Sequence, residues 1–513
     1  MSAEAGTSHA AAPINRGLVT ALVMLATIMQ VLDTTIANVA LPYMQGGLAA
    51  AQDQIAWVLT SYIVAAAIMT PMTGWLVARF GRKRIFLCSV AGFTLASLLC
   101  GAAGSLAEIV LFRILQGIFG AALVPLSQAV LLDINPPERH GSAMAVWGTG
   151  IMSAPILGPT LGGWLTQNYD WRWVFYINLP LGVIAFLGIL AFVPESEIER
   201  RPRFDLFGFA FLSLAIGAFQ MLLDRGEQKD WFGSTEIVIE AAIAALGLWI
   251  FVFHTLTTER PFLNTALLKD RNFVGGNVFM FIASAIMYAS LALLPPLLTM
   301  LDYPIVTTGL LQVPRGIAMM ASIMLVGRLA GRIDFRALLA IGLGATGASL
   351  WLMTGFSPEM DMRPVVVSGI IQGVGLGLLY GPINVATFAT LPQQVLTEGT
   401  ALYSLVRNIG GSVGISVAET LLARNIQISH SSLAQDVTPY NHALQQLGAA
   451  LSWTMSSDAG LAAIDRMVNL QAAMISYLDD FKFMMIVCLL AVPLLLLMRP
   501  GRRPAGNSGM ALE

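Results

Sequence analysis

The sequence is poor in charged residues. Asp, Glu, Lys and Arg together make up only 11% of its 513 residues, whereas hydrophobic residues make up 56%. An ordinary soluble domain carries roughly 25% charged residues. This composition therefore excludes an ordinary soluble domain and predicts an all-α, polytopic membrane protein. The formal net charge of −2 gives no reason to expect a nucleic-acid partner.

Cysteine and histidine are also scarce, and their placement argues against redox or metal chemistry. The three cysteines, Cys88, Cys100 and Cys488, lie within apolar runs, and the five histidines are scattered without ligand spacing. Glycine-rich runs such as Gly373 to Gly377 lie inside apolar segments and lack the Lys-Ser/Thr of a phosphate loop. We therefore expect no metal site, no catalytic residues, no cofactor and no ATP-driven step, and predict that the chain is not an enzyme.

Long apolar runs, in contrast, are abundant. A membrane-spanning helix needs about 20 predominantly apolar residues. The first run follows Arg16 as a secretion signal would, but it is too long for one and lacks a small-residue cleavage site, so we interpret it as an uncleaved span. Fourteen segments are predicted to span the membrane: 17–39, 55–78, 84–104, 107–131, 142–166, 172–193, 205–224, 234–256, 273–300, 308–327, 337–356, 364–390, 399–424 and 481–498.

The basic residues are unevenly shared between the two sides that these spans define. An even number of spans places both termini on one side, and the loops of that side hold eighteen Lys and Arg residues against seven on the other. The side richer in Lys and Arg is normally the cytoplasmic one. Both termini are therefore predicted to be cytoplasmic.

The chain contains an internal repeat. Gln116-Gly117 recurs as Gln372-Gly373, 256 positions later, which is also the offset between the starts of the first and ninth spans. Two parallel halves of this kind bind their substrate between them near the middle of the membrane. The expected organisation is a cytoplasmic tail (1–16), a six-helix bundle (17–193), an inserted helix pair with flanking loops (194–272), a second six-helix bundle (273–498) that includes a periplasmic loop (425–480), and a cytoplasmic tail (499–513).

A stretch rich in glycine and proline lies in the fifth predicted span. In WGTGIMSAPILGPTLGG, residues 147–163, five glycines remove side chains, and Pro155 and Pro159 are predicted to place two kinks on one face. Small residues let helices approach closely in lipid, and a proline inside a span is tolerated where packing or a cavity satisfies the freed carbonyls. A packing helix of no particular function is the plainer interpretation. The arrangement favours a helix that touches a neighbour closely, as a pivot.

Five stretches, in the correct order, resemble motifs of one transporter family. They are LDTTIANVALP (residues 32–42), the loop motif after the second span (Gly74, Arg79, Gly81, Arg82), the fourth-span motif (Arg113, Gln116, Gly117), the fifth-span stretch above, and WRWVFYINLP (residues 171–180). Together they resemble the fourteen-span drug:proton antiporters of the major facilitator superfamily. The acidic position of the loop motif is Ala78 here, so the usual charge clasp between this loop and a neighbouring helix is not predicted from that position.

The resemblance implies two six-helix bundles and an exporter of hydrophobic toxic compounds that is driven by the proton gradient. It implies a bacterial inner-membrane location, contact with lipid and a role in antibiotic resistance. The ending QAAMISYLDDF (residues 471–481) and the long loop before it are similar to a subtype that joins a periplasmic adaptor and an outer-membrane channel in a tripartite pump. The residues expected to act as the conformational motif are Gly74, Arg79, Gly81, Arg82, Pro155, Gly158, Pro159, Gly162 and Gly163.

Ionisable residues inside spans are functional candidates, since each costs roughly 2.5 to 3.5 kcal/mol at mid-membrane. Asp33, Arg113, Arg315 and Glu419 are predicted to form one polar layer, roughly 8 to 10 Å inside the outer boundary at 1.5 Å per residue. Asp33, Arg113 and Glu419 are the candidates for proton coupling, and a purely structural Asp33–Arg113 ion pair is the alternative. The candidates for the substrate cavity are Asn38, Gln116, Gln128, Arg315, Gln372, Asn384 and Arg407, of which Arg407 lies deeper.

The segment 425–480 is the only long polar stretch outside the predicted spans. Met467, Leu470, Met474 and Tyr477 recur at spacings of three and four, so its second half is predicted to be an amphipathic helix with a free apolar face. Such a face commonly marks a partner site, here for the adaptor. A mobile linker is the alternative.

Three functions stay open on the sequence alone. The first is a proton-coupled exporter of hydrophobic drugs, uncouplers or fatty-acid-like compounds. The second is an exporter of one endogenous metabolite, siderophore or fatty acid that uses the same helices. The third is a sensor or interaction protein that keeps the fold without transport, for which the missing acid at Ala78 is the only hint.

Overall fold

A computed structural model describes residues 15–136, 139–195, 204–259, 261–329, 333–438, 441 and 457–497. Within these ranges every regular element is an α-helix or a 3-10 helix, which confirms the all-α prediction. The tails expected at 1–16 and 499–513 lie outside the described residues, apart from residues 15 and 16.

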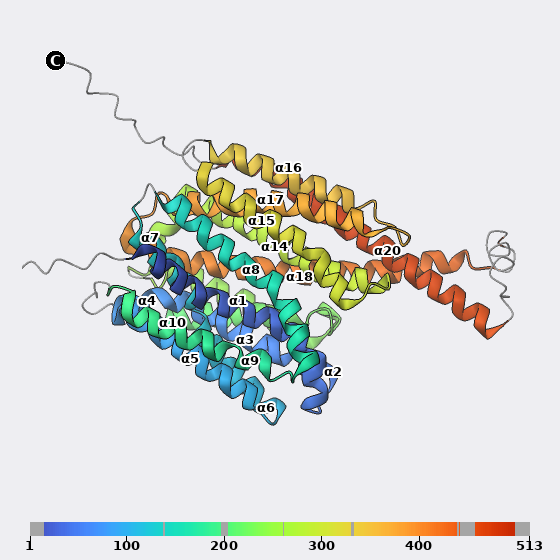
Figure 1. The fold of residues 1–513 in the computed structure, drawn as a ribbon, viewed down its shortest axis with the longest axis horizontal. Helices are drawn as coiled ribbons and strands as arrows, with labels where there is room; N and C mark the ends of the chain where they lie inside the picture. Colours follow the sequence, from blue (N-terminus) through green and yellow to red (C-terminus); the bar gives the residue numbers. More distant parts are fainter. Residues whose placement is uncertain are drawn as a thin grey trace, which may run out of the picture.

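The first half of the chain lies mainly in the lower part of Figure 1. The second predicted span consists of two α-helices joined by a 3-10 turn that contains Pro71, and the fourth consists of two α-helices, the second of which has Pro125 in its first turn. A missing backbone N–H is tolerated in a first turn. The helices are α1 (Arg16–Gly47), α2 (Gln52–Ile55), α3 (Trp57–Met69), η1 (Thr70–Met72), α4 (Thr73–Phe80), α5 (Arg82–Ala102), α6 (Leu106–Gly120), α7 (Leu123–Ile134), α8 (His140–Asn168), α9 (Trp173–Tyr176) and α10 (Asn178–Phe192).

The remainder of the chain comprises the inserted pair and the second half. These helices are α11 (Leu206–Arg225), η3 (Trp231–Gly233), α12 (Thr235–Thr257), α13 (Thr265–Lys269), α14 (Arg271–Met300), α15 (Ile305–Leu329), α16 (Phe335–Met353), α17 (Met362–Phe388), η4 (Gln393–Val395), α18 (Leu396–Gln435), α20 (Asp458–Leu490) and η5 (Val492–Leu497). Among the described residues, eleven helical stretches are long and apolar enough to cross a membrane. The long helices α8, α18 and α20 are not among the eleven, so the count of fourteen stays a prediction.

The segment 425–480, predicted as a periplasmic loop with a helix in its second half, is helical at both of its ends. α18 continues to Gln435 and α20 begins at Asp458, so both helices extend beyond the bundle, at the right of Figure 1. The predicted amphipathic helix is confirmed as part of α20. Part of its apolar face is covered, however, because α20 runs directly into the last predicted span: Met474 and Tyr477 belong to the main hydrophobic core. Met467 and Leu470 of the same face are half-buried, and the partner site stays a prediction. Residues 439, 440 and 442–456 lie outside the described residues.

The repeated Gln-Gly pair packs in the same way in both halves. At Gly117 a Cβ would come within 2.5 Å of the carbonyl oxygen of Tyr62, so α6 lies directly against α3. At Gly373 a Cβ would collide with the carbonyl oxygen of Arg315, so α17 lies directly against α15. These contacts agree with the repeat. In the first half they join the fourth and second predicted spans, and in the second half they join the twelfth and tenth, which are the spans at the corresponding places.

α8 touches α1 closely, as its glycines predicted. A Cβ at Gly158 would collide with the side chain of Thr35, and a Cβ at Gly162 would lie 3.2 Å from Cγ2 of Ile36. Gly163, in contrast, has no atom of another residue within 4 Å of its Cβ position. The helix continues through Pro155 and Pro159.

The same helix also touches the second half. A Cβ at Gly148 would lie 3.3 Å from Cγ2 of Ile323 on α15. Nearer the start of α8, a Cβ at Gly327 of α15 would come within 2.5 Å of Cβ of Ala145. α8 therefore lies at the boundary between the halves, in contact with both (Figure 1).

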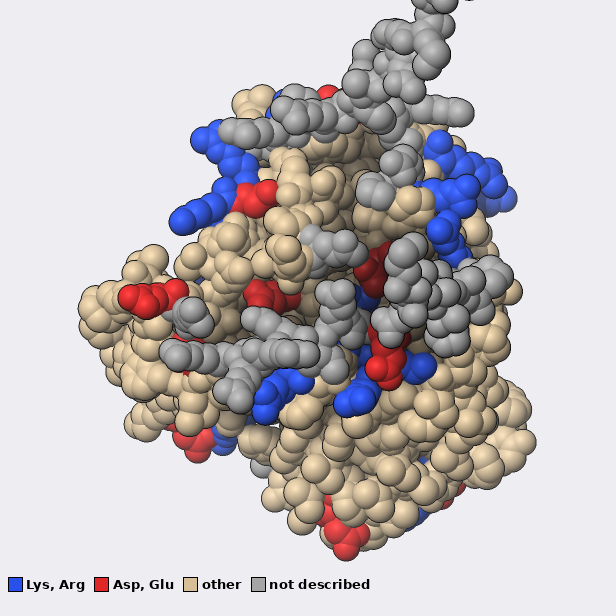
Figure 2. All heavy atoms as spheres, turned by 90° about the vertical axis from the view of Figure 1, so that its left-hand side faces the viewer, with Lys and Arg blue, Asp and Glu red and all other residues tan. Residues whose placement is uncertain are grey.

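The loop motif lies at the end of the bundle where α1 begins, and Figure 2 looks onto this end, where Lys and Arg side chains gather in several groups. Gly81 has a φ of 88°, which favours glycine, and caps α5. Arg82 forms an ion pair of 2.7 Å with Asp133 of α7, so a charge clasp exists although the acidic position of the motif is missing.

A Cβ at Gly74 would come within 2.6 Å of Glu398, which packs α4 against α18 of the second half. Arg79 is exposed in the last turn of α4.

Adding one methyl group to three glycines of α8 tests its contact with α1. Gly158→Ala should destabilise the protein most, because the added Cβ would collide with Thr35. Gly162→Ala should destabilise it less, and Gly163→Ala least, because the Cβ added at Gly163 meets no other residue. Overpacking of this kind costs about 1 to 3 kcal/mol. Thermal unfolding of the purified variants in detergent measures the order, and equal midpoints for Gly158→Ala and Gly163→Ala would contradict the contact.

Candidate functional site

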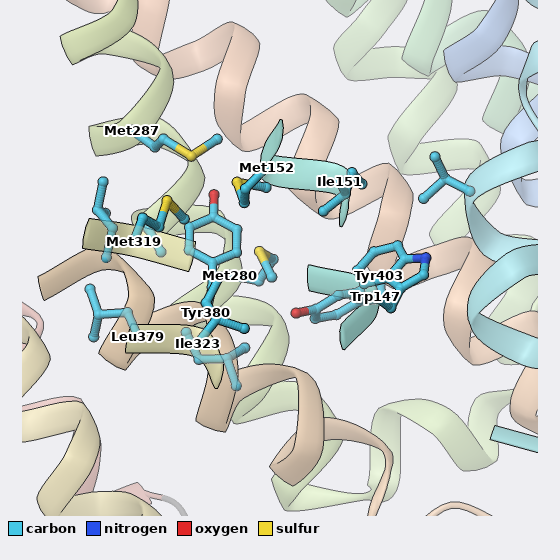
Figure 3. Packing of buried hydrophobic residues seen from close by; sticks show 14 of the residues in the cluster. Trp147, Ile151, Met152, Met280, Met287, Met319, Ile323, Leu379, Tyr380 and Tyr403 are labelled. Carbon is cyan, nitrogen blue, oxygen red and sulfur yellow. The ribbon is translucent and has the colours of Figure 1, made fainter. Parts of the chain in front are cut away.

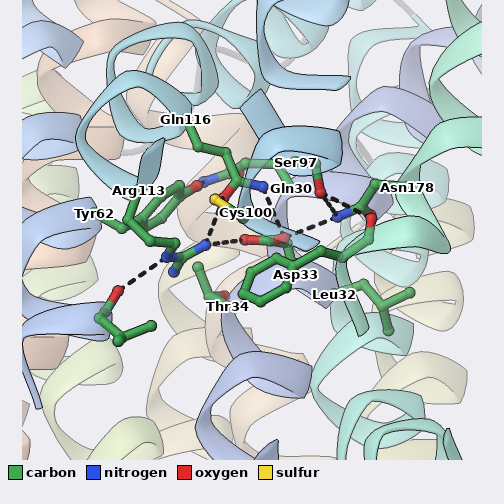
Figure 4. Close-up of polar contacts among 12 residues, drawn as sticks. Gln30, Leu32, Asp33, Thr34, Tyr62, Ser97, Cys100, Arg113, Gln116 and Asn178 are labelled. Atoms are coloured by element: carbon green, nitrogen blue, oxygen red, sulfur yellow. Dashed lines mark hydrogen bonds and ion pairs between the residues drawn. The ribbon is translucent and has the colours of Figure 1, made fainter. Parts of the chain in front are cut away.

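A fully buried ion pair lies in the middle of the first half (Figure 4). Nη1 of Arg113 on α6 donates to Oδ2 of Asp33 on α1 at 2.6 Å, and neither side chain is exposed. Nε of Arg113 donates to the carbonyl oxygen of Val58 on α3 at 2.9 Å. Three helices thus meet at one guanidinium group.

The carboxylate of Asp33 accepts two further hydrogen bonds, both at Oδ1. Gln116 donates from Nε2 at 2.9 Å, and Asn178 of α10 donates from Nδ2 at 2.8 Å. Gln116 also accepts from Nη1 of Arg113 at 2.7 Å, and Asn178 also donates to Ser97 of α5 at 2.9 Å. All three partners of the carboxylate are donors: two of them use both lone pairs of Oδ1, and the third uses one lone pair of Oδ2. A proton on Oδ1 would therefore displace a partner, and a proton on Oδ2 would remove the charge that strengthens all three bonds.

Aromatic rings hold the guanidinium group from its other sides. The centroid of the Tyr62 ring lies 4.2 Å from Cζ of Arg113, and that of Phe175 lies 5.7 Å away. Such cation–π contacts are strongest when desolvated, as here. Tyr62 in turn accepts a hydrogen bond of 3.1 Å from Gln30 of α1. The network therefore links five helices of the first half, together with the short α9.

Helix periodicity explains why the sequence brings these groups together. Arg113 and Gln116 are three residues apart on α6, so they lie on the same face, and the adjacent Gly117 lets that face approach α3. Asn178 is the first residue of α10, where the WRWVFYINLP stretch turns into the helix. Asp33 occupies the middle of α1, among apolar residues.

A second place of interest is a small pocket between the two halves. Figure 3 shows how several of its hydrophobic lining residues pack, among them Trp147, Met280 and Tyr380. Its lining is mainly apolar and contains two methionines, a type of side chain that adapts to different ligands. Two predicted cavity residues, Asn384 of α17 and Arg407 of α18, line it. The other lining residues are Trp147, Gly148, Ile151 and Met152 of α8, Met280 of α14, Ile323 of α15 and Tyr380 of α17.

Arg407 is the unusual member of this lining. Asn384 accepts a hydrogen bond of 2.7 Å from Tyr403, and the Tyr380 hydroxyl lies 3.0 Å from that of Ser284. Arg407 is only 6% exposed, yet it forms no hydrogen bond or ion pair within the described residues, and its Nε is buried without a partner there. A buried cation with unused donors is a place where an anion binds favourably.

The predicted polar layer joins only two of its four members. Arg315 of α15 is buried and reaches the carbonyl oxygen of Met287 at 3.4 Å, within the second half. Glu419 lies on an exposed part of α18, near the acidic groups of the inserted pair rather than near Asp33. Similar depth does not bring side chains together when they stand on helices of different halves.

The remaining cavity candidates are dispersed. Gln372 donates to Ser290 of α14 at 3.0 Å, the counterpart of the Gln116 contact with α1. Gln128 is buried in α7, and neither of its amide atoms has a hydrogen-bond partner within the described residues. Asn38 is exposed on α1. The roles assigned to these residues stay predictions.

The sequence interpretation missed Asn178, Ser97 and Tyr62. Asn178 was inside a stretch already singled out for its resemblance, and an amide among apolar residues at the start of a helix was an available signal. Ser97 and Tyr62 gave no such signal, because serine and tyrosine are common in spans and only the fold turns them toward Asp33.

The described part of the chain is helical, with eleven span-length stretches, similar glycine contacts in its two halves and a pocket at their boundary. This is the architecture of a membrane transport protein. The chain belongs to the Major Facilitator Superfamily, whose family description matches residues 23–415.

Relatives of known name support the same assignment. The chain is 36% identical to the fatty acid resistance protein FarB of Neisseria gonorrhoeae, over 94% of this chain and 96% of FarB. It is 34% identical to the multidrug export protein EmrB of Escherichia coli (strain K12), over 96% and 97% of the two chains. It is 37% identical to EmrB of Haemophilus influenzae, over 87% and 89%.

Solved structures share the fold at low sequence identity. A double-tryptophan mutant of XylE matches with a TM-score of 0.62 at 12% identity, over 94% of this chain and 96% of XylE. The human organic anion transporter MFSD10 matches with a TM-score of 0.59 at 13% identity, over 93% and 100%. These likenesses concern the fold alone.

Breaking and restoring the charge pair tests how the site is held. Asp33→Asn places an amide N–H₂ group against donors, so we expect it to destabilise the protein by about 3 to 5 kcal/mol. The double variant Asp33→Asn/Arg113→Gln replaces two charges by two amides that are able to pair, and should recover much of that loss. Thermal unfolding in detergent compares the variants, and a double variant no more stable than Asp33→Asn would contradict a direct pair.

Proposed function

We propose that this chain is a proton-coupled exporter of hydrophobic toxic compounds, a drug:proton antiporter. The observation that carries the proposal is the buried carboxylate of Asp33, whose three partners are all donors on α6 and α10. Since a proton would remove the charge that strengthens these hydrogen bonds, proton binding is linked to the contacts among α1, α6 and α10. Such a link is what exchange of a substrate for protons requires.

The substrate is proposed to bind between the halves. The pocket that contains Trp147, Met280 and Arg407 lies where α8 meets helices of the second half. The close glycine contacts of α8 with α1 and α15 supply the surfaces on which the halves would pivot. Substrate release and proton uptake would then alternate between the two sides of the membrane. The names of the EmrB relatives support multidrug export.

For the topology we propose fourteen spans in a bacterial inner membrane, with both termini cytoplasmic. Eleven stretches have sufficient length and hydropathy, and the long helices α8, α18 and α20 would add three more spans to make fourteen. The orientation is supported by the basic groups at the end of the bundle where α1 begins (Figure 2).

We further propose that a periplasmic adaptor docks at the opposite end and connects the chain to an outer-membrane channel. The proposal now rests on the projecting ends of α18 and α20 rather than on the apolar face of Met474 and Tyr477, which the core already covers. Ile428 and Leu461 remain exposed on the two projecting ends.

A second candidate, export of fatty acids, is favoured by Arg407. A buried cation without a partner in an apolar, methionine-containing pocket suits an amphipathic carboxylate better than a neutral dye. FarB, one of the relatives, is named for fatty acid resistance.

Proteoliposomes test the proton-coupled function directly. With purified protein reconstituted in one orientation, an imposed proton gradient should drive a fluorescent hydrophobic dye against its own gradient. The matched control is the double variant Asp33→Asn/Arg113→Gln, which is expected to fold and to lose accumulation because no carboxylate is left at this site. Equal accumulation by the control, or none by the unaltered protein, would refute the role given to Asp33 or the function itself.

Substitutions of Arg407 separate the two substrate classes. Arg407→Gln should weaken the binding of a long-chain fatty acid anion about tenfold or more, which corresponds to a loss of about 1.4 kcal/mol. Arg407→Lys keeps the charge and should retain most of the affinity, and a neutral dye should bind all three proteins alike. Isothermal titration calorimetry measures the affinities, and equal fatty acid binding by the Gln variant would exclude Arg407 from anion recognition.

A further inference from the structure

Asp480 is a buried carboxyl group that no contact explains. It lies in α20, is 1% exposed, and neither of its oxygens has a hydrogen-bond partner within the described residues. The adjacent Asp479 is an ordinary surface acid, since it is half exposed and pairs with Lys482 at 2.9 Å. The two acids therefore stand next to each other in the chain but in opposite surroundings.

The surroundings of Asp480 are largely apolar. Phe481 packs edge-on against Phe356, which follows α16, at 6.0 Å between ring centroids. Met484, one helical turn from Asp480 on the same face, contacts the Oγ of Ser290 on α14 through its sulfur at 3.9 Å. Ser290 is the residue that accepts the hydrogen bond from Gln372. Asp480 thus lies one turn from the polar contact that repeats, in the second half, the Gln116 contact of the first.

In the part of the chain that the structure describes, no basic side chain forms an ion pair with this acid. α20 packs on α18, α16, α14 and η5. The charged residues of α14 and α16 are Arg271 and Arg336, both in the first turn and so at the end where α1 begins, and η5 has none. α18 carries Glu398, Arg407, Glu419 and Arg424, and none of them forms an ion pair with Asp480. On α20 itself, Tyr477 lies within the electrostatic range of both Asp480 and Glu419.

An ionised carboxylate at this position would be an unpaired charge in a desolvated site, which costs several kcal/mol. A protonated carboxyl group avoids that cost. We infer that Asp480 is a second proton-binding site, which holds a proton in the conformation described here and releases it when movement between α20 and its neighbours admits water. The inference rests on the proposed proton-coupled function and extends it to the second half.

The internal repeat explains why the second half needs a carboxyl group from another helix. The offset of 256 places Ala289 where the first half has Asp33, and Gly369 where it has Arg113. The second half has therefore kept the glutamine contact without the charge pair beside it. Its buried acid comes from α20 instead, one turn from the same Ser290 contact. The two halves would then each carry one proton site, one paired with an arginine and one not.

Infrared spectroscopy of the purified protein tests the protonation state without any transport assay. The carbonyl band of a protonated carboxyl group should be present in the unaltered protein, should disappear on titration to high pH, and should be missing from Asp480→Asn. Asp479→Asn is the matched control, because its carboxylate is solvated and paired with Lys482, and its spectrum should keep the band. In proteoliposomes, Asp480→Asn should retain exchange of dye at zero proton gradient and lose most of the accumulation that the gradient drives.

The outcomes separate this inference from the proposed function. A band that is unchanged in Asp480→Asn, or full gradient-driven accumulation by that variant, would overturn the second site. Failure of Asp480→Asn to fold would overturn it as well, because an amide reproduces the shape of a protonated carboxyl group and is not expected to disturb an apolar site. If the unaltered protein accumulates no dye, the proposed function fails while the infrared measurement still reports on Asp480.

Discussion

A charge in the interior of a membrane protein must be matched, and the first half of this chain is arranged around one such match. The Asp33–Arg113 pair has no exposed atoms, so its stability depends wholly on the groups that the surrounding helices supply. α1 supplies the acid, α6 the base and Gln116, α3 a carbonyl oxygen and an aromatic ring, and α10 an amide. With α5, whose Ser97 accepts a hydrogen bond from Asn178, five helices are thereby held in a single relative position. A change of charge at their centre would weaken the contacts that hold it.

The second half treats its charges differently. Within the described ranges, Arg315 and Arg407 are buried without a carboxylate partner, and Asp480 is buried without a base. In a symmetric fold built from two similar halves, such asymmetry is a sign of divided roles. A satisfied pair favours a definite resting state, whereas unsatisfied groups leave binding energy available for something that arrives from outside. The asymmetry thus fits a first half whose buried acid is paired, a second half whose buried acid is left to bind a proton, and a boundary that responds to substrates.

Much of this arrangement was predictable from the sequence because its causes are local or repetitive. The apolar runs gave the helices, the 256-residue offset gave the like packing of Gly117 and Gly373, and the glycines of α8 gave its contact with α1. The Asp33–Arg113 pair was expected from two charges at similar depth.

The same reasoning failed for Glu419, because depth along a helix says nothing about which way a residue faces around the axis. It missed the burial of Asp480 because helix continuation depends on tertiary packing: the predicted amphipathic helix runs into the last predicted span as one helix, α20.

The uninterrupted length of α18 has a mechanical consequence. At 1.5 Å per residue its 40 residues form a rod about 60 Å long. The rod starts beside Gly74 of the loop motif, passes Arg407 in the pocket, and ends at Gln435 beyond the bundle. A helix without a break transmits tilt and rotation over its whole length, as a lever does. A protein bound at the Gln435 end of α18 would therefore be coupled, through the helix, to the conformation of the pocket without contacting the pocket itself.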